Sequence, residues 1–188
     1  MSGQDTIPKQ IPLCVRYVAG VLRDAHAMVS VAEALLARRS FHPLRGTKDA
    51  VYVSSLFSEP ECWLARIIWR SYGKLSEPKA LDPLDEVRVV EIHLAPSFAD
   101  EPMLVLAKAV LREPKTRREI WDAWDSDGYV GDVLARGAAT DSTLDLPTGA
   151  AARVLGIASS IRVLTSPMRN VPDEDAVLHR LVDPLLNL

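Results

Sequence analysis

An apolar repeat near the start of the chain constrains the fold more than any other feature of the sequence. Between residues 12 and 39, apolar side chains recur at steps of three and four, which places them on one stripe of an α-helix. The sequence therefore predicts a long N-terminal amphipathic helix that opens at Pro12 and runs to about Arg39. The stripe consists of Val18, Val21, Leu22, Ala25, Met28, Val29, Ala32, Leu35 and Leu36.

The length and composition indicate one globular unit. A chain of 188 residues fits a single domain with a substantial core. Its 48% hydrophobic and 25% charged residues are typical of globular proteins. We expect a mobile N-terminal tail over residues 1–11, followed by a single domain over residues 12–188.

Two segments are rich in β-branched residues and predict strands, near 50–54 and 86–94. A helical interpretation of residues 49–57 remains open. Between them, "SEPECWLARIIWRSYG" predicts a helix, because Ser58 and Glu61 have the spacing of a capping box and Gly73 supplies a stop. The order strand, helix, strand favours a crossover between parallel strands.

The sequence of the second half of the chain predicts mainly helix. Residues 99–124 predict helix with a break near Pro114, and "EDAVLHRLVD" predicts a final helix that ends near Pro184. Together with the N-terminal helix, these segments predict an α+β fold, a helix-rich single domain with a small sheet.

The stretch "TGAAARVLGIASSIRVL", residues 148–164, has the small residues and the glycine turn of a helix-turn-helix. Leu155, Gly156 and Ile157 fit the first half of that motif. In the second half, Arg162 stands where a recognition helix requires a buried aliphatic residue. We favour an Ala-rich helix that ends at Gly156 and leads into an edge strand, and DNA reading stays as the alternative.

Two basic segments, 38–48 and 153–169, are candidates for binding nucleic acid. The net charge of −3 means that only a local patch could attract phosphates. Cations at a helix end that complement its dipole are the alternative explanation of the first segment. The candidate residues are Arg38, Arg39, Arg45, Lys48, Arg153 and Arg162.

Glu91 and His93 alternate onto one face of the predicted strand at 86–94, so they are candidates for an acid–base or metal-binding pair of a small nuclease. An exposed polar strand face is the more common explanation of such a pattern. We predict no metal site, because the acidic turn near Gly128 has Ala123 and Leu134 where a calcium loop requires carboxylates. No cofactor is expected, since glycine-rich phosphate loops are absent from the sequence.

Trp121 and Trp124 lie three residues apart and share one face of a predicted helix. Core packing is the ordinary role of such a pair, but tryptophan also anchors many interfaces, so both are candidates for contact with a protein partner.

The remaining features favour a cytoplasmic protein without a membrane segment. No apolar run reaches the roughly 20 residues that a span requires, and two cysteines fit a reducing compartment. The leading prediction is a non-catalytic binding or assembly protein, a subunit of a larger bacterial cytosolic complex with a protein partner or a homo-oligomeric state. A nucleic-acid-binding protein is the alternative and a small nuclease is the third, which leaves open whether the protein is an enzyme.

Overall fold

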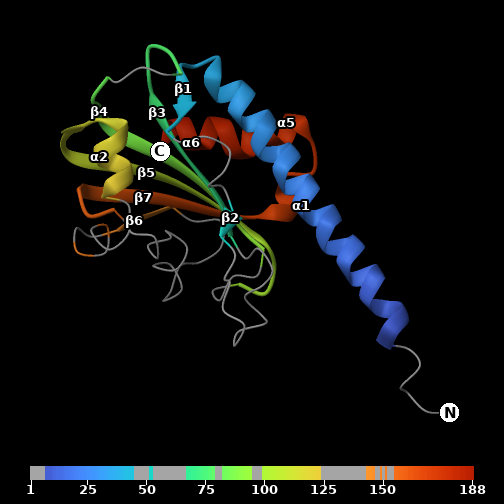
Figure 1. The fold of residues 1–188 in the computed structure, drawn as a ribbon. Coiled ribbons are helices and arrows are strands. Elements are labelled where there is room, and N and C mark those ends of the chain that lie inside the picture. The colour runs from blue at the N-terminus through green and yellow to red at the C-terminus, as the bar shows by residue number, and fades with distance from the viewer. Residues whose placement is uncertain are drawn as a thin grey trace.

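A computed structural model describes residues 7–44, 51–52, 67–78, 82–94, 99–123, 143–146, 149, 151 and 155–188. Its centre is one antiparallel sheet with the strand order β1-β3-β4-β5-β7-β6, and β2 also pairs with β3 (Figure 1). The strands are β1 Phe41–Pro43, β2 Val51–Tyr52, β3 Ile67–Lys74, β4 Leu84–His93, β5 Met103–Lys115, β6 Thr143–Leu146 and β7 Ala158–Pro167. Since β1 and β2 pair with opposite ends of β3, they occupy the same outer position in the sheet.

One long helix and a short C-terminal helical segment accompany the sheet. They share a buried apolar cluster with the sheet face that carries Val90, Ile92 and Leu104, so they cover that face. The helices are α1 Ile7–Ala37, α2 Arg117–Asp122, η3 Met168–Asn170, α5 Glu174–Val177, η4 Leu178–Val182 and α6 Asp183–Asn187. Figure 1 shows the N-terminal half of α1 projecting beyond the sheet.

A second apolar cluster lies on the opposite face of the sheet. Val87, Val89 and Val105 belong to it, together with Ile120 of α2. The central strands are thus buried on both faces, and the first part of β5 is a continuous apolar run in sequence rather than an alternation of apolar and polar residues.

This double burial explains why the prediction of a helix-rich domain with a small sheet is wrong. The helices do lie beside an antiparallel sheet, as in α+β proteins, but α1 is the only long one among the described residues. Residues 103–115, expected to be helical, form the longest strand, and of the described residues in that segment only 117–122 are helical, as α2. An apolar run that is buried on both faces of a sheet resembles a buried helix in sequence.

Two further predictions near β3 are also wrong. Ile67–Lys74 form a strand although a helix was expected to Gly73, and residues 58–66 lie outside the described residues. The predicted crossover from the strand near 50–54 to the strand at 86–94 is wrong as well, because β3 lies between β2 and β4 in the sheet and pairs with both in antiparallel fashion, with Trp69 opposite Glu91.

Other elements agree with the sequence. The long helix is present and already begins at Ile7, inside the segment expected to be a mobile tail. The strand expected over 86–94 is confirmed as β4, and Val51 and Tyr52 are in a strand rather than a helix. The final helical segment begins at Glu174, but it continues past Pro184, where we expected it to end, to Asn187.

The stretch at 148–164 does not form a helix-turn-helix. Residues 158–167 form β7, where the second helix would have to lie. Nor is β7 the edge strand that we favoured, because β6 pairs with its outer side and β5 with its inner side.

A tight turn directs α1 into β1. Ser40 has a φ of 62°, a left-handed conformation that is common where helices end. Its carbonyl accepts a hydrogen bond from the Leu75 amide at 2.9 Å, which ties the turn to the end of β3. The C-terminal end of α1 is therefore fixed to the sheet.

We predict that Leu36→Ala lowers the free energy of unfolding by about 2–5 kcal/mol, because the Leu36 side chain is completely buried between α1 and the sheet. Urea denaturation of the full chain measures the effect. The control is Leu144→Ala, at an exposed position on β6, which we expect to cost less than about 1 kcal/mol. Equal losses in the two variants would contradict the packing of α1 described above.

Candidate interaction surface

Helix α1 divides into a buried half and a projecting half. Ala25, Ala32 and Leu36 have no exposed surface, whereas none of the side chains from residue 16 to residue 24 is buried. Figure 1 shows the same division, since the helix leaves the body of the protein toward its N-terminus. We call residues 7–24 the arm of α1.

The apolar repeat of α1 continues from the buried half into the arm. Its positions alternate between steps of four and three residues, which is the seven-residue repeat of helices that pack against other helices. They are Ile7, Ile11, Cys14, Val18, Val21, Ala25, Met28 and Ala32. Within residues 16–24, Val18 and Val21 of this repeat are only partly buried, so the arm presents apolar side chains there that the described part of the protein does not fully cover.

The direction of the arm depends on a polar contact beneath the buried half. Glu33 Oε1 of α1 lies 2.9 Å from Arg70 Nε of β3. Tyr72 lies next to this pair and is fully buried, and desolvation, together with the charge of Glu33, raises its pKa above the ordinary value. The Glu33 side chain is 25% exposed and that of Arg70 9%, and the pair joins α1 to β3 and favours one register of the helix on the sheet.

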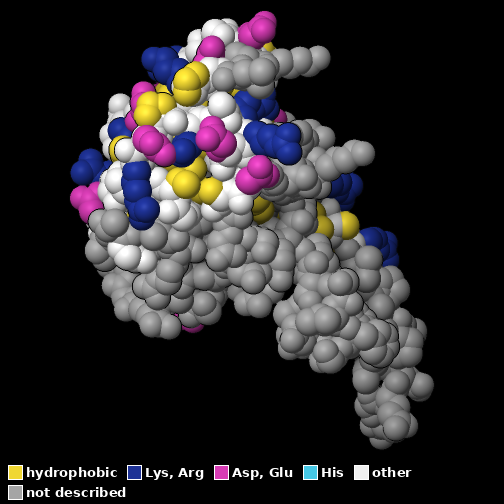
Figure 2. Space-filling model, turned by 60° about the vertical axis from the view of Figure 1, so that its left-hand side comes forward, with side chains coloured by type: hydrophobic (Ala, Val, Ile, Leu, Met, Phe, Trp, Pro, Cys, Tyr) yellow, Lys and Arg dark blue, Asp and Glu magenta, His cyan; other side chains and the backbone are white. Residues whose placement is uncertain are grey.

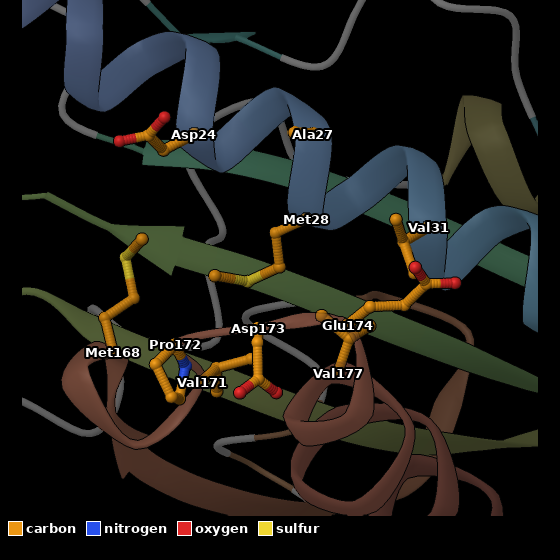
Figure 3. A pocket seen from close by; sticks show the side chains of 10 residues that line it. All are labelled: Asp24, Ala27, Met28, Val31, Met168, Val171, Pro172, Asp173, Glu174 and Val177. Atoms are coloured by element: carbon orange, nitrogen blue, oxygen red, sulfur yellow. The ribbon is translucent and has the colours of Figure 1, made fainter.

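An open groove lies beside α1 where the arm leaves the body. It has a volume of about 380 Å³ and separates α1 from the segment 168–177. Figure 3 shows Met28 and Val31 of α1 facing Met168, Val171 and Val177 across it.

Acidic residues accompany this apolar lining. Asp24, Asp173 and Glu174 also line the groove. The carboxylate of Asp173 accepts a hydrogen bond from the Ala176 amide at 2.9 Å and caps α5. All three side chains are exposed, so the groove combines an apolar lining with negative charge.

Tyr17 is the most exposed large apolar side chain of the described residues, at 73%. It lies on the arm, seven residues before Asp24 and fourteen before Val31. Because seven residues make almost two turns of a helix, Tyr17 lies on the same face of α1 as the groove. The sequence analysis missed both Tyr17 and the groove, although the seven-residue spacing was visible.

The structure brings Glu91 and His93 together, as their alternation predicted. Glu91 Oε2 lies 2.7 Å from His93 Nε2, on the sheet face opposite α1. Their exposed fractions are 1% and 2%, so the pair lies inside the protein rather than on an exposed strand face. The nuclease prediction remains untested, and this arrangement offers no surface at which the pair could contact a nucleic acid.

The predicted basic residues do not form one site. Arg38 and Arg39 are exposed at the end of α1, whereas Arg162 lies on β7, and β3, β4 and β5 separate β1 from β7. Arg45, Lys48 and Arg153 lie outside the described residues. Over the described part of the face in Figure 2, positive and negative side chains are interspersed.

Arg162 has a carboxylate partner that the sequence did not reveal. Its Nε donates to Asp145 Oδ1 at 2.7 Å, and its Nη2 donates to Asp145 Oδ2 at 3.3 Å. The hydrogen bond to Arg162 lowers the pKa of Asp145. This bidentate pair satisfies much of the charge that would otherwise attract a phosphate.

A row of cations crosses the sheet beside Arg162 and was also missed. Register places Arg88, Lys108 and Arg162 on adjacent strands. Glu86 contacts Arg88 at 2.9 Å and Lys108 at 3.1 Å. Burial, the largest effect, lowers the pKa of Arg88, while Glu86 raises it. Since carboxylates accompany these cations, the row is a network of ion pairs within the protein.

The other expectations concern tryptophan, metals and membranes. Trp121 lies in α2, and its side chain, like all of Trp124, lies outside the described part of the chain. Among the described residues, no group of His, Cys, Asp and Glu could hold a metal ion. Within the same residues, no helix is both long enough and apolar enough to cross a membrane.

Comparison with known proteins gives no match to a protein family, a curated protein or a solved structure.

We predict that Glu91→Ala lowers the free energy of unfolding by about 3 kcal/mol or more, because it leaves His93 buried without its carboxylate. Glu113→Ala is the matched control, since Glu113 is exposed and its ion pair with Lys115 is screened by water, so we expect a much smaller loss of stability. Chemical denaturation measures both variants. A Glu91→Ala protein as stable as the control would rule out the structural role of the pair.

We also predict that Arg162→Ala raises the pKa of Asp145 toward the ordinary value, measured by NMR titration of the side-chain carboxyl. A carboxyl whose pKa is lowered by folding stabilises the folded state above its unfolded pKa. That contribution is lost as the pH falls through the lowered folded value. An unchanged Asp145 titration in the variant would show that the ion pair does not form in solution.

Proposed function

We propose that this protein is a non-catalytic binding or assembly protein that uses the arm of α1 to contact another polypeptide. The observation that carries the proposal is the apolar repeat of α1, which continues through the arm although none of residues 16–24 is buried. Membership of a larger cytosolic complex is part of this proposal.

The composition of the arm supports the need for a partner. Gly20 and three valines have lower helix propensity than alanine or leucine, and Pro12 removes one backbone donor. In proteins, most of the stability of a helix comes from packing of its apolar face rather than from helix propensity. We expect a helix with this sequence to depend on packing for its stability, and a partner that covers its apolar face would supply that packing.

Binding to nucleic acid receives less support from the geometry. Arg162 is paired with Asp145, and β3, β4 and β5 separate its strand from β1. Nor does the buried Glu91–His93 pair favour a nuclease. We therefore advance the assembly function alone.

Site-specific photo-crosslinking in the native cells tests the proposal. The variant Val21→p-benzoylphenylalanine places the crosslinker on the apolar face of the arm. We expect it to form an adduct with one defined polypeptide, whose crosslinked residue is identified by mass spectrometry. The control, Arg23→p-benzoylphenylalanine, lies on the exposed opposite face and should give little or no adduct. Absence of an adduct at position 21, or equal adducts at both positions, would contradict the proposal.

A further inference from the structure

We propose that the polypeptide bound by the arm is a second copy of this chain. The two α1 helices would pack in antiparallel orientation, with Tyr17 of each copy inserted into the groove of the other. This inference rests on the proposed function, because it names the partner of the same arm.

The position of Tyr17 on the groove face of α1 is the first argument. A symmetric dimer uses the same patch on both copies, so the patch must carry both the projecting group and the depression that receives it. Tyr17 and Met28 are eleven residues apart, about 16 Å along the helix. A two-fold axis midway between them, near Leu22 and Arg23, would bring Tyr17 of each copy opposite Met28 of the other.

The chemistry of the groove suits a tyrosine. Met28, Val31 and Val177 provide apolar contact for the ring. The neighbouring carboxylates of Asp24 and Glu174 could accept the phenolic hydrogen. The volume of about 380 Å³ is ample for one ring, since a cavity of roughly 150 Å³ already holds benzene.

Charge complementarity favours the same arrangement. Residues 7–22 contain Lys9 and Arg16 and no acidic residue. The groove contributes Asp24, Asp173 and Glu174. Antiparallel packing would bring Arg16 of each copy close to the negative groove of the other, an arrangement that accelerates association and disfavours parallel packing.

Sedimentation equilibrium of the purified full chain, over a range of concentrations, tests the inference. We expect a monomer–dimer equilibrium and expect Tyr17→Asp to raise its Kd at least tenfold. Leu144→Asp is the matched control, because Leu144 is also an exposed apolar residue but lies on β6. The dimer of this variant should have a Kd within about twofold of the wild-type value.

A mixing experiment tests whether the contact is reciprocal. Val31→Asp changes the groove and leaves Tyr17 intact, so each variant alone loses both contacts of the dimer. An equimolar mixture of Tyr17→Asp and Val31→Asp keeps one intact contact, and we expect it to form more dimer than either variant alone. Circular dichroism checks that both variants fold, and Tyr17, being exposed, should tolerate substitution.

Two results would overturn the inference. One is a wild-type chain that stays monomeric at all concentrations, and the other is a dimer whose Kd is unchanged by Tyr17→Asp. If position 21 then crosslinks to a different polypeptide in cells, the assembly function stands and only the second copy is excluded. If position 21 gives no adduct, the proposed function fails as well.

Discussion

The contact between the C-terminal half of α1 and the sheet determines the position of every other feature of the candidate surface. Leu36 is fully buried there, and Glu33 pairs with Arg70 of β3. Because this half is fixed, the direction in which the arm leaves the body is fixed too. The contact also places Met28 and Val31 opposite the segment 168–177, so it creates the groove.

The polar groups beneath α1 give that contact its specificity. A displaced α1 would lose the packing of Leu36 and would separate Glu33 from Arg70, so both contacts favour one position of the helix. Arg88 adds to the arrangement, since its guanidinium lies 6.0 Å from the centre of the Phe41 ring and so links β4 to β1. Burying these cations is costly, and in return the helix has a single position.

The sequence predicted the elements that carry a clear local signal and failed where a buried apolar run carries none. The period of α1 was readable because polar residues occupy its other side, and β4 was recognised by its β-branched residues. In β5, residues 103–107 are all buried, so neither a period of two nor one of 3.6 stands out. For this reason the sheet was underestimated and the helix content overestimated.

Less of the candidate surface was predictable, because it depends on contacts between distant segments. Charge alone singled out Arg162, but its partner Asp145 is set by the register of β6 on β7. The groove exists only because residues 168–177 return to α1 after β7. The exposure of Tyr17 depends on where the body of the protein ends along the helix, which no local pattern indicates.

Hydrogen exchange along α1, at protein concentrations below and above the Kd of the dimer, tests the central claim most directly. The account predicts that amides of residues 25–36 are equally protected at both concentrations, because the sheet covers them. Protection of residues 16–24 should rise with concentration, because a partner covers them. Equal protection of both halves at every concentration, or an arm that remains unprotected throughout, would contradict it.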